Sequence, residues 1–243
     1  MQRFKRILCF AGAASNSVSL RRAYHLAKTN GATLTIMDVI KPMPKAVGLM
    51  TDIAAPDELQ ELVAKDHERK LLDQMAEYSD QDVAAELVLT TGDPATEVIR
   101  YVIDQDIDLV IKTAEQDSPT ERLFGSVTRS LLRMCPCPVW VLKPEIHGPF
   151  DRVLAAIDLE ADDETHQKLN HEILELAFSV AKSEQADLHI VSAWNLWMEE
   201  PLRRRAGDQE VDKMLGMQQS KIQVAQMFFK GLIWRSPKAR SQP

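Results

Sequence analysis

Short apolar, branched runs alternate with amphipathic segments between residues 4 and 142, and this alternation limits the chain to few folds. Five runs have the length and composition of buried strands, and apolar residues recur at helical spacing between them. The expected strands cover residues 4–11, 32–40, 84–90, 108–113 and 138–142. Strands that alternate with helices favour a parallel, doubly wound sheet with helices on both faces, an α/β fold.

Turn residues between the runs support the expected helices. Residues 92–94 (Gly-Asp-Pro) combine a tight turn, an N-cap and a proline at the first helical position, so a helix should follow them. Residues 30–31 (Asn-Gly) form a C-cap signal that ends an earlier helix. A further helix is expected at residues 126–134. Residues 57–78 predict a long amphipathic helix whose expected buried side chains are Leu59, Leu62, Val63, Leu71, Leu72 and Met75.

The strand pattern starts again after residues 145–149, which lie in a segment rich in proline and glycine and are expected to form a linker. Residues 152–158 repeat the pattern of residues 6–12, and residues 181–188 repeat that of residues 27–34. We therefore expect one complete domain followed by a partial repeat of the same unit. Their expected bounds are residues 1–144 for the first domain and residues 150–200 for a strand-helix-strand half of the second.

Residues 201–243 differ in composition from the rest of the chain. They carry nine basic and three acidic side chains, whereas the whole chain has a net charge of −7. Residues 209–230 have helical periodicity, but residues 231–243 match no part of the expected fold. The expectation is a helical, basic, atypical tail after a second domain that is truncated or frameshifted. One alternative is an adaptor that contacts nucleic acid or membrane through this tail.

Composition and motifs exclude several classes of function. The acidic net charge argues against specific or general binding of nucleic acid. No run approaches the roughly 18 apolar residues of a membrane span, and no signal-peptide pattern opens the chain, so a cytoplasmic location is expected. Cys9, Cys135 and Cys137 are expected to be buried or half-buried apolar residues. The histidines are scattered and no nucleophile motif is present, so we expect neither a metal site nor catalysis.

Several motifs occur together in the first domain. They are Gly-Asp-Pro-Ala at residues 92–95, Asp-Leu-Val-Ile at 108–111, Gly-Ser-Val-Thr at 125–128 and Cys-Pro-Val at 137–139. In this order they resemble the universal stress protein family, over residues 3–143 as a full domain and about 150–198 as half of another. The tandem arrangement is similar to the E-type members. The resemblance implies a flavodoxin-like, Rossmann-like sheet of five parallel strands in the order 3-2-1-4-5, with ligands at the carboxyl ends of strands 1 and 4.

The resemblance also implies how nucleotide-binding members hold their ligand. An aspartate at the end of strand 1 holds the adenine, and a loop of the pattern Gly-x2-Gly-x9-Gly-Ser/Thr wraps the phosphates. Here strand 1 ends in Ala-Gly at residues 11–12, and the loop at 113–126 lacks its first two glycines. Only Gly125 and Ser126 remain, with Asp158 in place of the aspartate in the second copy. The alternatives are that Ser126 is a helix N-cap and that Asp158 is a turn or capping residue.

The function expected from these observations is that of a non-catalytic universal stress protein. It would act in a bacterial-type stress response through domain association, with a small-molecule pocket and no required cofactor. Self-association would occur between the two domains or through strand 5, where Val139, Trp140, Val141 and Leu142 would form the interface. The alternative is an ATP-binding member with nucleotide-dependent signalling, for which Gly125, Ser126 and Asp158 are the available residues.

Overall fold

The computed structural model describes residues 3–12, 17–43, 56–78, 82–114, 125–144, 150–158, 163–192 and 199–217. Contacts divide the chain into two units, residues 1–147 and residues 148–243. The expected linker at residues 145–149 lies outside the described residues, as do residues 115–124 of the expected phosphate loop and the tail beyond residue 217.

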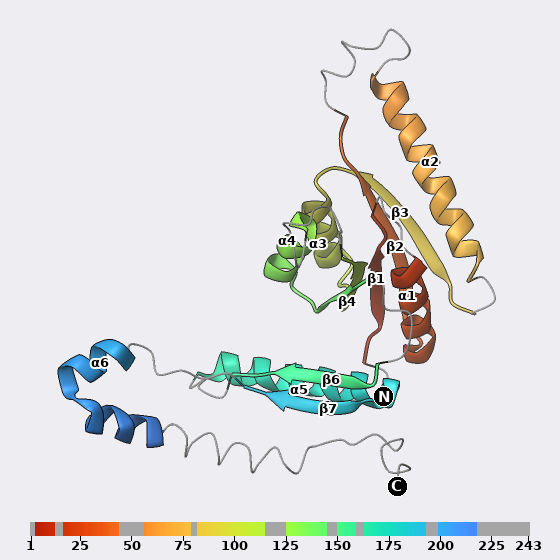
Figure 1. The fold of residues 1–243 in the computed structure, drawn as a ribbon. Coiled ribbons are helices and arrows are strands. Elements are labelled where there is room, and N and C mark those ends of the chain that lie inside the picture. The colour runs from red at the N-terminus through yellow and green to blue at the C-terminus, as the bar shows by residue number, and fades with distance from the viewer. Residues whose placement is uncertain are drawn as a thin grey trace. The chain divides into compact units, whose positions relative to one another are not determined.

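The first unit contains a five-stranded parallel sheet in the order β3-β2-β1-β4-β5 (Figure 1). This order confirms the expected flavodoxin-like topology. Each strand is an apolar run whose branched residues suit a sheet covered on both faces. The strands are β1 (Arg6–Phe10), β2 (Thr33–Ile40), β3 (Ala85–Thr91), β4 (Leu109–Thr113) and β5 (Val139–Leu142).

Two layers of helices enclose this sheet. The helices α1 (Ser17–Asn30) and α2 (Pro56–Ala76) lie on one face. The helices α3 (Pro94–Asp104) and α4 (Ser126–Met134) lie on the other (Figure 1). The chain therefore forms a three-layer α/β unit in which the central strands β1 and β4 are shielded from water.

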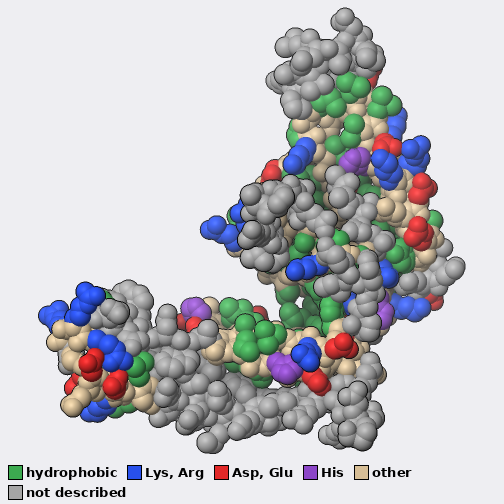
Figure 2. Space-filling view, in the orientation of Figure 1, with side chains coloured by type: hydrophobic (Ala, Val, Ile, Leu, Met, Phe, Trp, Pro, Cys, Tyr) green, Lys and Arg blue, Asp and Glu red, His purple; other side chains and the backbone are tan. Residues whose placement is uncertain are grey.

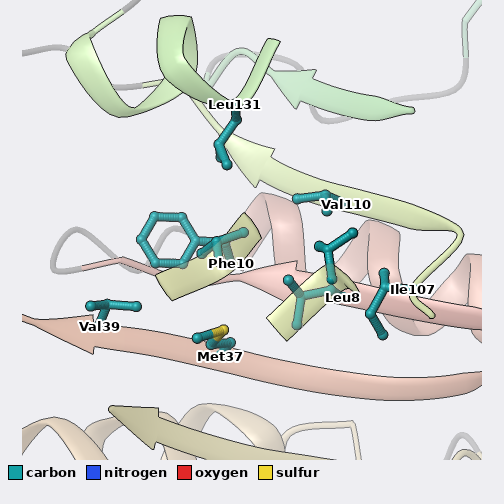
Figure 3. Close-up of a cluster of buried hydrophobic side chains, with 9 residues drawn as sticks. Leu8, Phe10, Met37, Val39, Ile107, Val110 and Leu131 are labelled. Atoms are coloured by element: carbon teal, nitrogen blue, oxygen red, sulfur yellow. The ribbon is translucent and has the colours of Figure 1, made fainter. Parts of the chain in front are cut away.

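A cluster of buried side chains fills the space between the sheet and the α3/α4 layer (Figure 3). Alternate residues of each strand point to this face because successive side chains in a strand alternate between faces. Burial of such a cluster is the main favourable contribution to folding of the unit. Its buried members are Leu8, Phe10, Met37, Val39, Val98, Val102, Ile107, Val110 and Leu131.

Asp108 joins the beginnings of the two central strands. Its carboxylate accepts hydrogen bonds from the backbone N–H groups of Lys5, at 2.7 Å, and Arg6, at 3.2 Å. The N–H of Asp108 donates to the carbonyl of Arg6 at 3.0 Å. These contacts connect residues 103 and 102 positions apart in the sequence, so they fix β1 beside β4.

Helix caps form where the turn residues predict them. The Asp93 carboxylate accepts hydrogen bonds from the Thr96 N–H at 3.0 Å and the Thr96 hydroxyl at 2.7 Å. Pro94 begins α3, as expected. Gly31 ends α1 with a φ of 63°, a left-handed conformation that glycine adopts without steric cost.

The predicted buried face of α2 is partly wrong. Leu62, Val63 and Leu72 are exposed, and Leu62 retains 60% of its accessible surface. The face turned toward the sheet instead carries His67 and the buried Leu71. These two residues are four positions apart and lie on the same side of a helix, whereas Leu62 and Leu72 lie off that side.

The second unit begins with a parallel strand pair. It contains β6 (Arg152–Ala156), α5 (Glu164–Glu184), β7 (Asp187–Val191) and α6 (Glu199–Ala206), and residues 208–217 are also helical. Arg152 pairs with Asp187 in register, as Arg6 pairs with Thr33 in the first unit. The segments with matching sequence patterns in the two units therefore pair their first two strands in the same way.

Only one face of the β6/β7 pair is covered by α5. Val153, Ala155, Leu188 and Ile190 pack there with alanines of the helix. The other face carries Leu154, Ala156, His189 and Val191, all exposed. Leu154 retains 66% of its accessible surface, whereas its counterpart Leu8 in the first unit is fully buried. Figure 2 shows hydrophobic side chains on the surface of this unit.

Candidate functional site

The carboxyl ends of β1 and β4 form the candidate site. From these neighbouring strands the chain leads in opposite directions, to β2 on one side and to β5 on the other. Ligands of open α/β sheets bind at such a switch point. β1 is followed by Ala11 and Gly12, and Gly12 has a φ of 65°, a left-handed value that favours glycine. No carboxylate follows β1 at these two positions.

A buried lysine lies at the end of β4. Lys112 retains 2% of its accessible surface, and its Nζ donates a hydrogen bond of 2.6 Å to Thr128 Oγ1. The same Nζ lies 6.0 Å from the centre of the Phe10 ring, within the range of a cation–π contact. Burial of an ammonium group costs free energy unless such partners compensate it. Lys112 therefore connects β1, β4 and the first turn of α4 across the switch point.

Gly125 and Ser126 stand at the start of α4. Gly125 is buried and is the N-cap residue, with its carbonyl accepting a hydrogen bond from the Arg129 N–H at 3.1 Å. Ser126 is the first residue of the helix and is exposed. The expectation that Ser126 caps this helix is therefore wrong, because the helix begins one residue earlier than a serine cap requires. Thr128, two residues further on, is the buried hydroxyl that contacts Lys112.

Asp158 belongs to the second unit and follows β6. It is exposed, and its N–H donates to Asn170 Oδ1 at 3.0 Å. The Asn170 side chain in turn donates to the Asp158 carbonyl at 2.5 Å. This reciprocal contact fixes the end of β6 against α5. Gly125 and Ser126 thus lie at the start of α4 in the first unit, whereas Asp158 lies in the second unit.

The four residues expected at an interface form β5, a strand with one strand neighbour, β4, in the described part of the chain. Leu142 is buried and Val139 packs on the core cluster. The Trp140 ring lies 5.5 Å from the guanidinium of Arg22 on α1. Val139, Trp140 and Val141 remain half-exposed. Their role in association stays a prediction.

A second buried polar contact, which was not predicted from the sequence, lies on the α2 side of the sheet. Asp38 in β2 retains 1% of its accessible surface, and its carboxylate lies 2.7 Å from Nδ1 of His67 in α2. The other carboxylate oxygen accepts a hydrogen bond of 2.8 Å from the Val39 N–H. A carboxylate inside an otherwise apolar strand was the signal that could have predicted a partner.

The cysteines are placed as expected, with Cys9 buried and Cys135 and Cys137 half-buried. Burial raises the pKa of the Cys9 thiol to about 12, and a hydrogen bond with Ser19 opposes this rise. Among the described residues, no group of three or more His, Cys, Asp or Glu side chains is arranged to hold a metal ion. None of the described helices has the length and hydropathy that a bilayer crossing requires.

Basic residues gather on α6 in the second unit, where Figure 2 shows a group of blue side chains. Arg203 contacts two carboxylates, Asp208 at 3.2 Å and Asp212 at 3.0 Å. The positive charge of this helix is thus partly neutralised within the unit, which weakens the case for an adaptor that binds anions through it.

A parallel sheet in the order β3-β2-β1-β4-β5, with helices on both faces and a switch point between β1 and β4, places the first unit in the flavodoxin-like α/β class. Residues 3–143 match the model of the universal stress protein family. The chain therefore belongs to the universal stress protein family.

Curated relatives agree with this assignment. The chain is 29% identical over 185 residues to Universal stress protein E of Photorhabdus laumondii, and the match covers 72% of this chain. It is 27% identical over 182 residues to Universal stress protein E of Escherichia coli strain K12, with the same coverage. In both cases it spans 57% of the relative's length. The similarity supports an E-type member of the family.

Solved structures share the fold. The structure of PA1789 from Pseudomonas aeruginosa PAO1, described as functionally unknown, has a TM-score of 0.59 and is 20% identical. The match covers 89% of this chain and 70% of that chain. A putative universal stress protein from Pseudomonas aeruginosa UCBPP-PA14 has a TM-score of 0.59 at 21% identity, with the same coverage. At this identity the similarity concerns the fold alone.

Proposed function

We propose that this chain is a non-catalytic stress-response protein of the cytoplasm that acts through domain association and does not require a nucleotide. Membership of the universal stress protein family supports the stress-response role. The observation that carries the rest is the contact of Lys112 with Thr128 and Phe10 at the switch point. The buried side chain of Lys112 joins β1, β4 and α4 at the switch point. In a nucleotide-binding member this region has glycines, whose backbone N–H groups can approach a phosphate.

The segment that follows β1 also supports this proposal. Ala11 and Gly12 provide no carboxylate to accept a hydrogen bond from an adenine amino group. Of the family's phosphate loop, this chain has only Gly125 and Ser126 at the start of α4, and it lacks the two earlier glycines. Asp158 belongs to the second unit, where Asn170 holds its backbone.

The experiment is a native mass spectrum of the purified chain, recorded without and with Mg-ATP. We expect the same mass in both spectra. An adduct of nucleotide mass that disappears in the variant Gly125→Val would instead support the alternative, an ATP-binding protein with nucleotide-dependent signalling. Gly216→Val is the matched control, because a side chain added at this glycine of the second unit meets nothing within 4 Å.

The same spectrum reports association through β5. The carbonyl groups of Pro138 and Leu142 accept hydrogen bonds from Val110 and Ala114 of the β4 side. Because N–H directions alternate along a strand, the N–H of Val141 points to the opposite edge. Val141→Pro removes that donor and should shift a dimer to monomer, whereas Val141→Thr should not. An unchanged dimer in Val141→Pro would exclude pairing through this edge.

A further inference from the structure

Two cysteines meet where α4 passes into β5. The Sγ atoms of Cys135 and Cys137 are 3.6 Å apart and share a thiol hydrogen bond. The Cys135 N–H donates to the Leu131 carbonyl at 2.9 Å, so Cys135 also ends α4. Both side chains are half-buried at the margin of the core cluster, and the Pro136 between them is exposed. The pair is thus accessible to small molecules and held by two ordered elements.

The two thiols differ in acidity. The hydrogen bond from the Cys137 thiol lowers the pKa of Cys135 to about 7, against the opposing effect of burial. The same hydrogen bond, burial and the negative charges of Cys135 and Asp108 raise the pKa of Cys137. One sulfur is therefore available as a thiolate near neutral pH, while the other keeps its proton until the first has reacted.

The distance between the sulfurs permits a covalent bond after a small movement. A disulfide has an S–S length of about 2.05 Å, so the two Sγ atoms need to approach by roughly 1.5 Å. Rotation of half-exposed side chains in the short segment between α4 and β5 can provide this approach. The pair lies at the beginning of β5, near Asp108 at the beginning of β4, and so at the opposite end of the sheet from Lys112.

We propose that Cys135 and Cys137 form a redox-active dithiol that a low-molecular-weight disulfide, such as glutathione disulfide, oxidises to an intramolecular disulfide. The Cys135 thiolate attacks one sulfur of the small disulfide, and a mixed disulfide forms as one small thiolate leaves. Cys137 then loses its proton to water and its sulfur attacks Cys135, which expels the second small thiolate. The protein dithiol loses two electrons, and the small disulfide gains them as two thiols.

This inference does not depend on the proposed function, because the pair is remote from the switch point. Cys9 provides an internal control within the same chain. It is fully buried in β1, and its raised pKa leaves it protonated at neutral pH. It should therefore remain a free thiol that reacts only after the chain is unfolded.

The test uses the full chain, equilibrated with glutathione buffers of increasing oxidising strength and then alkylated in the native state. We expect two alkylated thiols in reduced glutathione and none in glutathione disulfide, with intact mass lower by two hydrogen atoms. Proteolytic peptides should locate the bond between Cys135 and Cys137. The variant Cys9→Ala should behave identically, because Cys9 takes no part.

Variants that lack one of the two cysteines distinguish the attacking thiol from the resolving thiol. In Cys137→Ser, Cys135 should accumulate as a mixed disulfide, heavier by one glutathionyl group, because the resolving thiol is missing. In Cys135→Ser, glutathionylation of the protein should be slower than in Cys137→Ser, because burial and the charge of Asp108 still raise the pKa of the remaining thiol. Far-ultraviolet circular dichroism verifies that each variant is folded.

Two results would overturn the proposal. One is a wild-type chain that keeps both native-state thiols after long exposure to excess glutathione disulfide. The other is a wild-type chain that stops at a mixed disulfide on Cys135, since Cys137 would then not act as the resolving thiol.

Discussion

The matching segments 6–12 and 152–158 place a leucine at the same position of the first strand of each unit, in opposite environments. Leu8 in β1 is fully buried beneath α3 and α4, whereas Leu154 in β6 retains 66% of its accessible surface. The same substitution at both positions is therefore a controlled comparison. We predict that Leu8→Ala strongly destabilises the first unit and that Leu154→Ala leaves the second unit almost unchanged.

The magnitude follows from what each truncation removes. At Leu8 the lost transfer free energy and the cavity left among Phe10, Met37 and Val110 together cost roughly 3 kcal/mol. At Leu154 the removed atoms are already largely in water, and the cost should be below about 0.5 kcal/mol. A loss of roughly 3 kcal/mol corresponds to a change of about 100-fold in the unfolding equilibrium.

Native-state hydrogen exchange followed by peptide mass spectrometry is the appropriate assay, because it reports the two units separately. The most protected amides of β1, β2 and β4 should exchange about 100-fold faster in Leu8→Ala. Amides of β6 and β7 should exchange at the wild-type rate in Leu154→Ala. Exchange that accelerates equally in both variants would refute the reasoning, because it would mean that the outer face of β6 and β7 is covered in solution.

The remaining predictions concern single polar groups. Asp93→Ala should destabilise the first unit by about 1 kcal/mol in urea unfolding, because α3 loses its cap. The cap hydrogen bonds lower the pKa of Asp93, so the difference from wild type should be full above about pH 4 and shrink as the pH falls further; an unchanged difference at low pH would contradict this. His67→Ala should cost roughly 1–3 kcal/mol by leaving the Asp38 carboxylate with one partner fewer, and wild-type stability in Leu72→Ala provides the control. Alkylation of Cys135 by iodoacetamide should rise with pH around a midpoint of about 7, below the value of about 8.5 for an ordinary cysteine, and a midpoint at the ordinary value would exclude its activation.

The sheet of the first unit could be predicted because local signals agree along the chain. Gly31 and Asp93 terminate and start helices as their residue types require, and the branched runs between them form the strands. The strand order came from the family resemblance, since alternation alone leaves several orders open. The buried face of α2 was assigned to Leu62 and Leu72 because hydrophobicity outweighed helical phase, and His67 takes part of that face instead.

The chemistry of the candidate site was harder to predict. A lysine near the end of a strand ordinarily extends to water, and nothing local indicates that Lys112 meets a hydroxyl 16 residues further on. The distance between Lys112 Nζ and the Thr128 hydroxyl depends on how α4 packs over β4. In contrast, Cys135 and Cys137 are separated by one residue, so the spacing already indicated that their side chains could meet. Their difference in acidity depends on burial and on Asp108, which the sequence does not place.

The bonds from Asp108 to Lys5 and Arg6 also have a consequence for synthesis of the chain on the ribosome. At about 5–20 residues per second, the roughly 100 residues between them take about 5–20 seconds to be made. During that interval β1 has β2 beside it, but its other edge and the hydrophobic face later covered by α3 and α4 are open. By contrast, the partner residues of β6 and β7 are 35 positions apart and emerge within a few seconds of one another. The first strand to be made is thus among the last to be completed, and the nascent chain needs protection against aggregation longest at β1.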